Sequence, residues 1–326
     1  MGQPQADVTI ERHLGGSDRE AALCADARAG LTASPKGMPP KWFYDAEGSR
    51  LFDEVTRLPE YYLTRAEASI LAARAGEIAE VSGADTIVEL GSGTSEKTRI
   101  LLSALADRGQ LRRFVPFDVD ESILLEASEA LTREFPGLEV HAVVGDFERH
   151  LPLLPRGGRR LLAFLGSTIG NLRPEPRLAF LRELRAAMDP GDSLLLGVDL
   201  LKDPARIVPA YSDSAGVGER YSRNMLRVLN AELDADFDVE SFDHVARWNA
   251  EDEWLEVGLR STRAQRATVR RIDHEVSFEA GEEMHNQISA KFRREGIEGE
   301  LQTAGLTPTA WWTDDAGDFG LSLSQA

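Results

Sequence analysis

The segment IVELGSGTSEKT, residues 87–98, constrains the fold more than any other part of the chain. An apolar run ends in Glu89, glycines follow at Gly91 and Gly93, and a helical pattern then begins. Glycine lets the backbone pass close to a ligand, and the start of a helix offers unpaired N–H groups. This order predicts a nucleotide-containing ligand at the first strand of a doubly wound α/β sheet.

The third small position of this turn is Thr94 rather than glycine. The change departs from the G-x-G-x-x-G pattern of dinucleotide sites and disfavours a pyrophosphate ligand. It therefore argues against a nicotinamide dehydrogenase, whereas S-adenosylmethionine (SAM), which carries no phosphate, tolerates it. A glycine turn can also serve packing alone, so the segment is interpreted together with the strand ends that follow it.

Composition narrows the class of protein. The chain has 37 Lys and Arg against 55 Asp and Glu, a net charge of −18, which disfavours binding to nucleic acid. No apolar run is long enough to span a bilayer, so no membrane partner is expected. Cys24 is the single cysteine, which excludes an intrachain disulfide and suits a reducing cytoplasm. The six histidines lack metal-ligand spacing, so no metal is predicted.

Strand-like and helical patterns alternate through the middle of the chain. The strand-like runs are 86–90, 113–118, 140–145, 160–166 and 193–198, and the helical patterns lie near 97–106, 121–134 and 175–188. Apolar strands separated by amphipathic helices predict a parallel sheet that helices cover on both faces. Ligands of such sheets bind at the carboxyl ends of the strands.

The character of the sequence changes after Asp199. Helical patterns are followed by strand-like runs, at 243–249, 254–261, 265–269 and 274–278, and the tail holds a helix and two short strands. Residues 1 to about 18 are expected to be loose. We predict a Rossmann-like α/β domain, 67–202 with 292–326, and a second α+β domain, 13–66 with 203–291. A monomer is expected, because the second domain should cover the exposed end of the sheet.

Polar residues follow three of the predicted strands. Asp118 ends the second strand, where a carboxylate accepts hydrogen bonds from ribose hydroxyls. Asp146 and Phe147 follow the third, where a carboxylate beside a ring suits adenine, and Asn171 follows the fourth, where a substrate would lie. The alternatives are helix caps for Asp118 and Asn171 and an ordinary turn for Asp146. The centre of GSTIGN is Thr168, not serine, so a hydrolase elbow is not predicted.

Several motifs together resemble one family. They are ELGSGTSEKT at 89–98, FDVD at 117–120, GDFE at 145–148, FLGSTIGN at 164–171, KWFYDAEGSRLFDEVTRLPEYY at 41–62 and WWTDDAGDFGLSL at 311–323. From about residue 19 to the C-terminus the chain resembles, in the same order, the bacterial L-histidine Nα-methyltransferases of ergothioneine biosynthesis. The resemblance implies a class I SAM-dependent methyltransferase core and an amino-acid substrate that receives three methyl groups on one α-nitrogen, giving histidine betaine.

The resemblance also implies roles for individual residues. SAM would contact Gly91, Lys97, Asp118, Asp146 and Phe147. The amino acid would contact Tyr61, Asn171 and Tyr211, and its side chain would meet the segment from Gln287 to Ser289. Tyr44 would lie near the α-amine and, with Tyr61, act in catalysis by orienting the neutral amine or relaying its proton. The rings of Tyr44, Phe52, Tyr61 and Tyr221 are candidates for holding the methylated, cationic nitrogen.

Two positions depart from the family pattern. Histidine-specific members resemble one another in having Glu where Gln287 stands, and Met is familiar where Val257 stands. A neutral acceptor makes a weaker hydrogen bond to an imidazole N–H than a carboxylate does. The changes either admit a larger aromatic amino acid such as tryptophan or leave histidine recognition intact. A SAM-binding module without catalysis is a further alternative.

Overall fold

The computed structural model describes residues 8–326 of the chain, which divide into two compact units. The first unit comprises residues 63–201 and 292–326 with the N-terminal segment up to Leu14, and the second comprises 15–62 and 202–291. The domain bounds predicted from the sequence stay a prediction. The assignment of SAM to the first unit and of the amino acid to the second stays a prediction.

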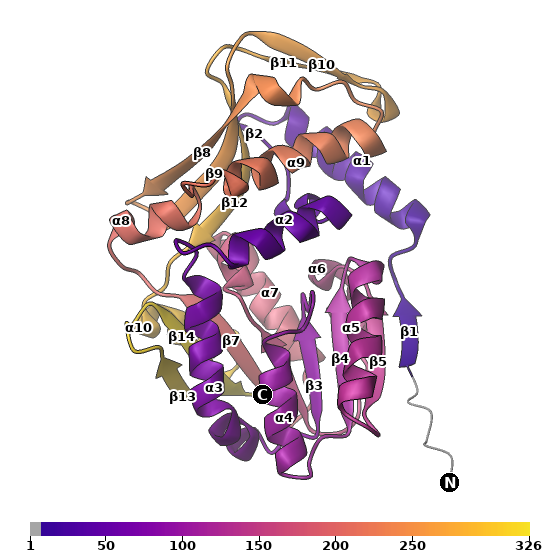
Figure 1. The fold of residues 1–326 in the computed structure, drawn as a ribbon, viewed down its shortest axis with the longest axis vertical. Helices are drawn as coiled ribbons and strands as arrows, with labels where there is room; N and C mark the ends of the chain where they lie inside the picture. Colours follow the sequence, from indigo (N-terminus) through magenta and orange to yellow (C-terminus); the bar gives the residue numbers. More distant parts are fainter. Residues whose placement is uncertain (1–7) are drawn as a thin grey trace. The chain divides into compact units, whose positions relative to one another are not determined.

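An eight-stranded sheet forms the centre of the first unit, in the order β1-β5-β4-β3-β6-β7-β14-β13 (Figure 1). The strands are β1 Val8–Arg12, β3 Thr86–Leu90, β4 Arg113–Asp118, β5 Glu139–Val144, β6 Arg160–Phe164, β7 Ser193–Asp199, β13 Thr307–Thr313 and β14 Phe319–Gln325. The six strands from β1 to β7 pair in parallel, and β14 runs antiparallel to both its neighbours. This confirms the predicted Rossmann-like α/β fold.

Helices alternate with the strands and cover the sheet. They are α3 Leu63–Ser82, α4 Thr98–Asp107, α5 Glu121–Glu134, α6 Phe147–His150, α7 Pro174–Ala187 and α10 Arg294–Thr303. Figure 1 shows α3, α4 and α5 in front of the sheet and α7 behind it. Every residue of β3 and β6 is buried, as expected for strands covered on both faces. Across residues 8–326, no helix has the length and apolar character that crossing a membrane requires.

The strand β1 was not predicted. Its residues pair in parallel with β5, with Val8 opposite Val140 and Arg12 opposite Val144. Only Val8 and Ile10 mark the alternation, and the strand lies at the edge of the sheet, so the local pattern was too short to be recognised. The prediction of a loose segment was therefore wrong for residues 8–12, and its part covering residues 1–7 lies outside the described residues.

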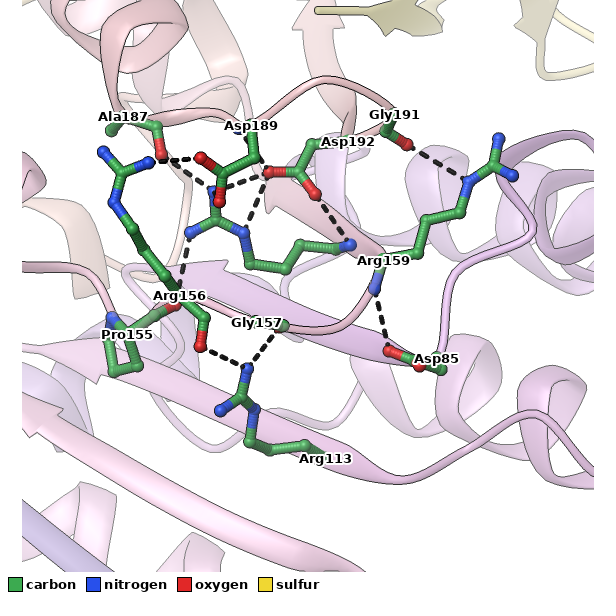
Figure 2. Close-up of polar contacts among 11 residues, drawn as sticks. Asp85, Arg113, Pro155, Arg156, Gly157, Arg159, Ala187, Asp189, Gly191 and Asp192 are labelled. Carbon is green, nitrogen blue, oxygen red and sulfur yellow. Dashed lines mark hydrogen bonds and ion pairs between the residues drawn. The ribbon is translucent and has the colours of Figure 1, made fainter.

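A polar network joins the amino ends of the central strands (Figure 2). The buried Arg160, at the start of β6, donates from Nε and Nη2 to Asp192 Oδ2, at 2.9 and 2.5 Å. Asp192, just before β7, also accepts the backbone N–H of Arg160 at 2.9 Å and that of Asp189 at 2.8 Å. Because these contacts lie at the ends opposite to the expected ligand site, we interpret the network as structural.

The second unit is built on a smaller sheet of order β2-β12-β9-β8 and a separate pair, β10-β11. The strands are β2 Lys36–Gly37, β8 Phe242–Asn249, β9 Trp254–Ser261, β10 Gln265–Val269, β11 His274–Phe278 and β12 Glu283–Ala290, and the helices are α1 Gly16–Thr32, α2 Ala46–Thr56, α8 Pro204–Ile207 and α9 Val217–Glu232. The sequence patterns predicted β8 to β11 but not β12. This strand carries a bulge between His285 and Gln287, which breaks the two-residue alternation.

Candidate active site

The glycine turn after β3 has the backbone that its sequence predicts. Gly91 and Gly93 have φ angles of +69° and +48°, in the left-handed region that glycine adopts without strain. The Gly91 N–H donates to the Phe117 carbonyl at 2.8 Å, which fixes the turn against the end of β4. A Cβ on Gly93 would meet no atom within 4 Å, and Ser92 Oγ is buried without a hydrogen-bond partner. The turn thus leaves open space and a polar atom for a ligand.

Asp118 lies against this turn. Its Oδ2 accepts the Gly93 N–H at 2.9 Å, and its Oδ1 accepts the Asp120 N–H at 3.2 Å. The N-cap of α5 is Asp120, whose Oδ1 accepts from Ser122 at 2.9 Å. The cap alternative therefore applies to Asp120 and not to Asp118. Asp118 thus lies at the end of β4 against the glycine turn, and its contact with a ribose stays a prediction.

Asp146 and Phe147 belong to the same end of the sheet. The Gly145 N–H donates to the Asp118 carbonyl at 2.9 Å, so the two strand ends are tied together. Asp146 is the N-cap of α6 and accepts the Glu148 N–H at 2.9 Å, while its predicted contact with adenine stays a prediction. A Cβ built on Gly91 would lie 3.7 Å from the Phe147 ring, so that ring approaches the glycine turn.

Lys97 makes a contact that the sequence did not suggest. Its ammonium forms an ion pair with Glu67 of α3, whose side chain is wholly buried. Glu67 also accepts the Gly166 N–H, at 2.8 Å to Oε1 and 3.0 Å to Oε2. Glu67 thus joins the start of α4 to the turn after β6. It occupies the buried face of α3 with Leu63, Ile70 and Leu71, and an acidic residue in that apolar pattern is the signal that could have revealed it.

Glu89 is the next-to-last residue of β3, just before the glycine turn. Burial raises the pKa of its carboxyl to about 7, although the hydrogen bond from Thr98 and the charge of Lys97 act against this rise. The group therefore exchanges its proton near neutral pH. A cationic ligand beside it would favour the ionised form, which suits a donor that carries a sulfonium and an ammonium group.

Asn171 ends the short helical turn Thr168–Asn171 that follows β6. The turn begins at Ser167, which has a left-handed φ of +57° and accepts the Asp199 N–H through Oγ at 2.9 Å. The N-cap of α7 is Arg173, so Asn171 is not the cap of that helix. Asn171 thus lies at the carboxyl end of β6, as predicted, in a turn that is held to the end of β7.

His150 gives this end of the sheet a pH dependence. Its Nδ1 accepts the Asp146 N–H at 3.0 Å, and burial lowers the pKa of the imidazole below its ordinary value of 6.5. The nearby Arg149 and His13 lower this pKa as well, while the Asp146 carboxylate opposes them. A protonated Nδ1 of His150 could not accept this hydrogen bond, so only the neutral imidazole makes this contact with the turn at Asp146.

We therefore expect SAM affinity and the stability of the first unit to decrease as the pH falls below about 6.5. The sign for stability follows because the folded protein binds the His150 proton more weakly than the unfolded chain does. SAM affinity would decrease because protonation removes the hydrogen bond between His150 and the turn at Asp146. Calorimetric SAM titrations between pH 8 and pH 5 should show a loss of roughly tenfold. In the His150→Asn variant, Oδ1 can accept the same N–H but cannot titrate, so this loss should shrink. An equal pH profile in both proteins would contradict the assignment.

In the second unit, four of the predicted aromatic residues form one cluster. The Tyr44 ring contacts those of Phe52 and Tyr221 edge to face, with centroids 5.7 and 6.0 Å apart. The Phe52 ring is 6.2 Å from Tyr61, which is in turn 6.2 Å from Tyr211. Burial is the main cause that raises the pKa of Tyr221 well above its ordinary value, and the nearby Tyr44 raises it further. The Tyr221 hydroxyl therefore keeps its proton. The cluster offers ring faces for a methylated cation.

The predicted specificity residues face each other in the smaller sheet. Gln287 of β12 pairs with Val257 of β9, and Ser289 pairs with Leu255. Val257 is buried in an apolar cluster with Leu255 and Ile207, against which Tyr211 packs. The Tyr211 hydroxyl lies 2.7 Å from Ser289 Oγ. The structure thus brings Tyr211, Val257, Gln287 and Ser289 together.

Two further residues of this region were not recognised in the sequence. Lys291 is buried and donates to both Ser289 and Tyr211, at 2.8 and 3.1 Å. Asn286 is the additional residue at the bulge of β12, is only 2% exposed, and has neither amide atom in a hydrogen bond. Since polar groups are rarely buried without a reason, a lysine and an asparagine in this buried strand were the available signals.

Within residues 8–326, no group of three or more His, Cys, Asp or Glu side chains could hold a metal ion. The polar groups at the glycine turn, in contrast, fit a nucleoside with an attached amino acid.

Comparison with known proteins decides the family. The sequence profile of the family described as "Histidine-specific methyltransferase, SAM-dependent" matches residues 23–326. The chain belongs to this family. It is therefore a SAM-dependent methyltransferase of class I fold, and SAM is its methyl donor.

Relatives within and beyond bacteria support this membership. A histidine N-alpha-methyltransferase of Mycobacterium tuberculosis is 58% identical and covers 97% of this chain and 99% of its own length. Ergothioneine biosynthesis protein 1 of Neurospora crassa is 29% identical over 89% of this chain and 33% of its own. A 4-dimethylallyltryptophan N-methyltransferase of Penicillium roqueforti is 29% identical over 59% of this chain and 60% of its own.

Proposed function

We propose that this methyltransferase acts on the α-amino nitrogen of L-histidine and adds three methyl groups in succession, giving the histidine betaine of ergothioneine biosynthesis. The observation that carries the proposal is the 58% identity, over nearly the whole of both chains, to a histidine N-alpha-methyltransferase. The lone cysteine supports a cytoplasmic protein, and the net charge of −18 disfavours nucleic acid as a partner. We also propose that the protein acts as a monomer and binds no membrane.

The first unit would hold the donor. When bound, SAM supplies a methyl group on a sulfonium centre. The Asp118 carboxylate would accept from the ribose hydroxyls, and Asp146 and Phe147 would hold the adenine. Gly91 would let the backbone approach the donor, and Lys97, fixed by Glu67, would lie beside it. A direct displacement requires no nucleophilic side chain, and the protein would contribute positioning and the exclusion of water.

The remaining predicted residues would hold the amino acid. Asn171 and Tyr211 carry donors suited to its carboxylate, and Tyr61 would contact its backbone end. The α-amine must lose its ammonium proton before it can accept a methyl group. The Tyr44 hydroxyl would orient the neutral amine or pass its proton to water. As methyl groups accumulate, the rings of Tyr44, Phe52, Tyr61 and Tyr221 would hold the cationic nitrogen.

A larger aromatic amino acid such as tryptophan is the second candidate substrate. The observation that favours it is the pairing of Val257 with Gln287, because both departures from the histidine-specific pattern then fall at one point of the sheet. The likeness to a tryptophan-derivative methyltransferase shows that a related chain can act on an indole-bearing compound. Gln287 still offers an acceptor to an imidazole N–H, which keeps histidine as the first candidate.

Mass spectrometry of the protein incubated with SAM and a mixture of the twenty amino acids tests the proposal. We expect three methyl groups on histidine. Restoring the carboxylate with Gln287→Glu should increase kcat/KM for histidine by roughly tenfold, since a charged acceptor strengthens the hydrogen bond by about 1 kcal/mol or more. Trimethylation of tryptophan in place of histidine would support the second candidate. If none of the twenty amino acids gains a methyl group, the result would contradict both candidates.

A further inference from the structure

Lys291 is an unusual residue for the interior of the second unit. It directly follows β12, and its side chain is only 4% exposed. Removing an ammonium group from water is costly, and apolar side chains of similar volume often stabilise such positions better. Burying Lys291 is therefore not expected to stabilise the fold by itself. Its contacts indicate a further role.

The ammonium forms a closed triangle with two hydroxyl groups. Lys291 Nζ lies 2.8 Å from Ser289 Oγ and 3.1 Å from Tyr211 Oη, and the two hydroxyl oxygens are 2.7 Å apart. The ammonium also lies 4.8 Å from the centroid of the Tyr211 ring. Lysine has three donors and no acceptor, so both contacts use lone pairs of the hydroxyl oxygens.

Counting hydrogens shows what the triangle offers to a ligand. Each hydroxyl has one hydrogen, and either oxygen can be the donor in the contact between Tyr211 and Ser289. One of the two hydroxyl hydrogens lies in the hydrogen bond between Tyr211 and Ser289. The other hydroxyl hydrogen therefore points out of the triangle. The ammonium occupies an acceptor position on both oxygens. The group therefore presents a hydrogen-bond donor whose hydroxyl also accepts from an ammonium, and it favours a ligand atom that accepts.

The position of the triangle relates it to the predicted amino-acid site. Ser289 and Gln287 are two residues apart on β12 and so project from the same face of the sheet. The Tyr211 ring lies 6.2 Å from that of Tyr61. The acceptors of an aromatic amino acid are its carboxylate and, in histidine, an unprotonated ring nitrogen. Both fit a donor that is strengthened by an adjacent cation.

We propose that Lys291 is a positioning residue that orients the hydrogen-bonded pair of Tyr211 and Ser289 hydroxyls, so that the one hydrogen left over is donated to an acceptor atom of the amino-acid substrate. This inference rests on the proposed function only in taking an amino acid as the ligand. Lys291 acts through the two hydroxyls, so removing them should remove most of its effect. This dependence separates a positioning role from a purely structural one.

The test compares Lys291→Met, which keeps the length of the side chain without charge or donors, with Lys291→Arg, which keeps both. We expect Lys291→Met to raise KM for histidine by 10- to 100-fold and to leave the Kd for SAM within about twofold, while Lys291→Arg recovers at least part of the loss. In a Tyr211→Phe, Ser289→Ala background, Lys291→Met should raise KM by less than about threefold further. Thermal unfolding checks that each variant folds.

Equal effects of Lys291→Met in the two backgrounds, or an unchanged KM, would overturn the inference. Should Lys291→Met fail to fold, the same comparison is made with Lys291→Gln. Titrating histidine and phenylalanine by calorimetry separates this inference from the proposed function, because binding is measured whether or not methyl transfer occurs. A loss of affinity for both ligands identifies the carboxylate as the partner, and a loss for histidine alone identifies the ring nitrogen; either result supports the positioning role.

Discussion

Asp118→Ala is expected to raise the Kd for SAM by roughly 100- to 1,000-fold. Two ribose hydroxyls would lose a charged acceptor, at about 1.5–3 kcal/mol for each hydrogen bond before compensation by water. The change also removes the acceptor of the Gly93 N–H, which holds the glycine turn at 2.9 Å. Isothermal titration with SAM measures the loss directly.

Asp120→Ala is the matched control, because this acidic residue lies two positions away and caps α5. Its loss should reduce stability by about 1 kcal/mol and leave SAM affinity nearly unchanged. Asp118→Asn keeps one acceptor and should lose less affinity than Asp118→Ala. A Kd that stays within threefold of the wild-type value in Asp118→Ala would show that this carboxylate does not bind the donor.

Asp192→Ala is expected to lower the free energy of unfolding by about 3–5 kcal/mol. The Arg160 guanidinium is wholly buried, and Asp192 is its carboxylate partner at 2.5 Å. Removing this partner leaves the buried charge with only the weaker 3.4 Å carboxylate contact to Asp189, and two backbone N–H groups lose their acceptor. Urea unfolding followed by circular dichroism measures the effect.

Asp189→Ala provides the comparison for this stability change. The Asp189 side chain is 41% exposed and lies 3.4 Å from the same guanidinium, so its loss should cost less than about 1 kcal/mol. The double substitution Arg160→Met, Asp192→Leu should recover much of the stability, because it removes both charges. Equal losses from Asp192→Ala and Asp189→Ala would contradict the account of the network.

The central sheet could be predicted from the sequence because its strands are buried on both faces. Such strands read as continuous apolar runs between glycine turns and helices, and β3 and β4 begin and end where the pattern indicated. The polar residues Asp118, Asp146 and Asn171 were chosen by the same logic, since Asp118 ends β4 and the other two lie in the turns after β5 and β6. Their places at strand ends predicted ribose, adenine and substrate contacts, and the family resemblance added SAM and an amino acid as the ligands.

The second unit was harder to predict because its determinants are not periodic. The bulge at Asn286 removes the alternation that would have marked β12, and with it the strand that carries Gln287 and Ser289. Glu67 and Lys291 are charged residues buried by contacts with residues 30 and 80 positions away in sequence, Lys97 and Tyr211. Local sequence patterns contain no information on such distant pairs, so tertiary structure is needed to find them.

The most direct test of the central claim is NMR of the product formed from histidine and SAM labelled with ¹³C in its transferable methyl group. We predict a single ¹³C resonance from three equivalent methyl groups on the α-nitrogen, with both ring nitrogens unmodified. Labelled methyl on a ring nitrogen, or no transfer to histidine by protein that binds SAM, would contradict the account.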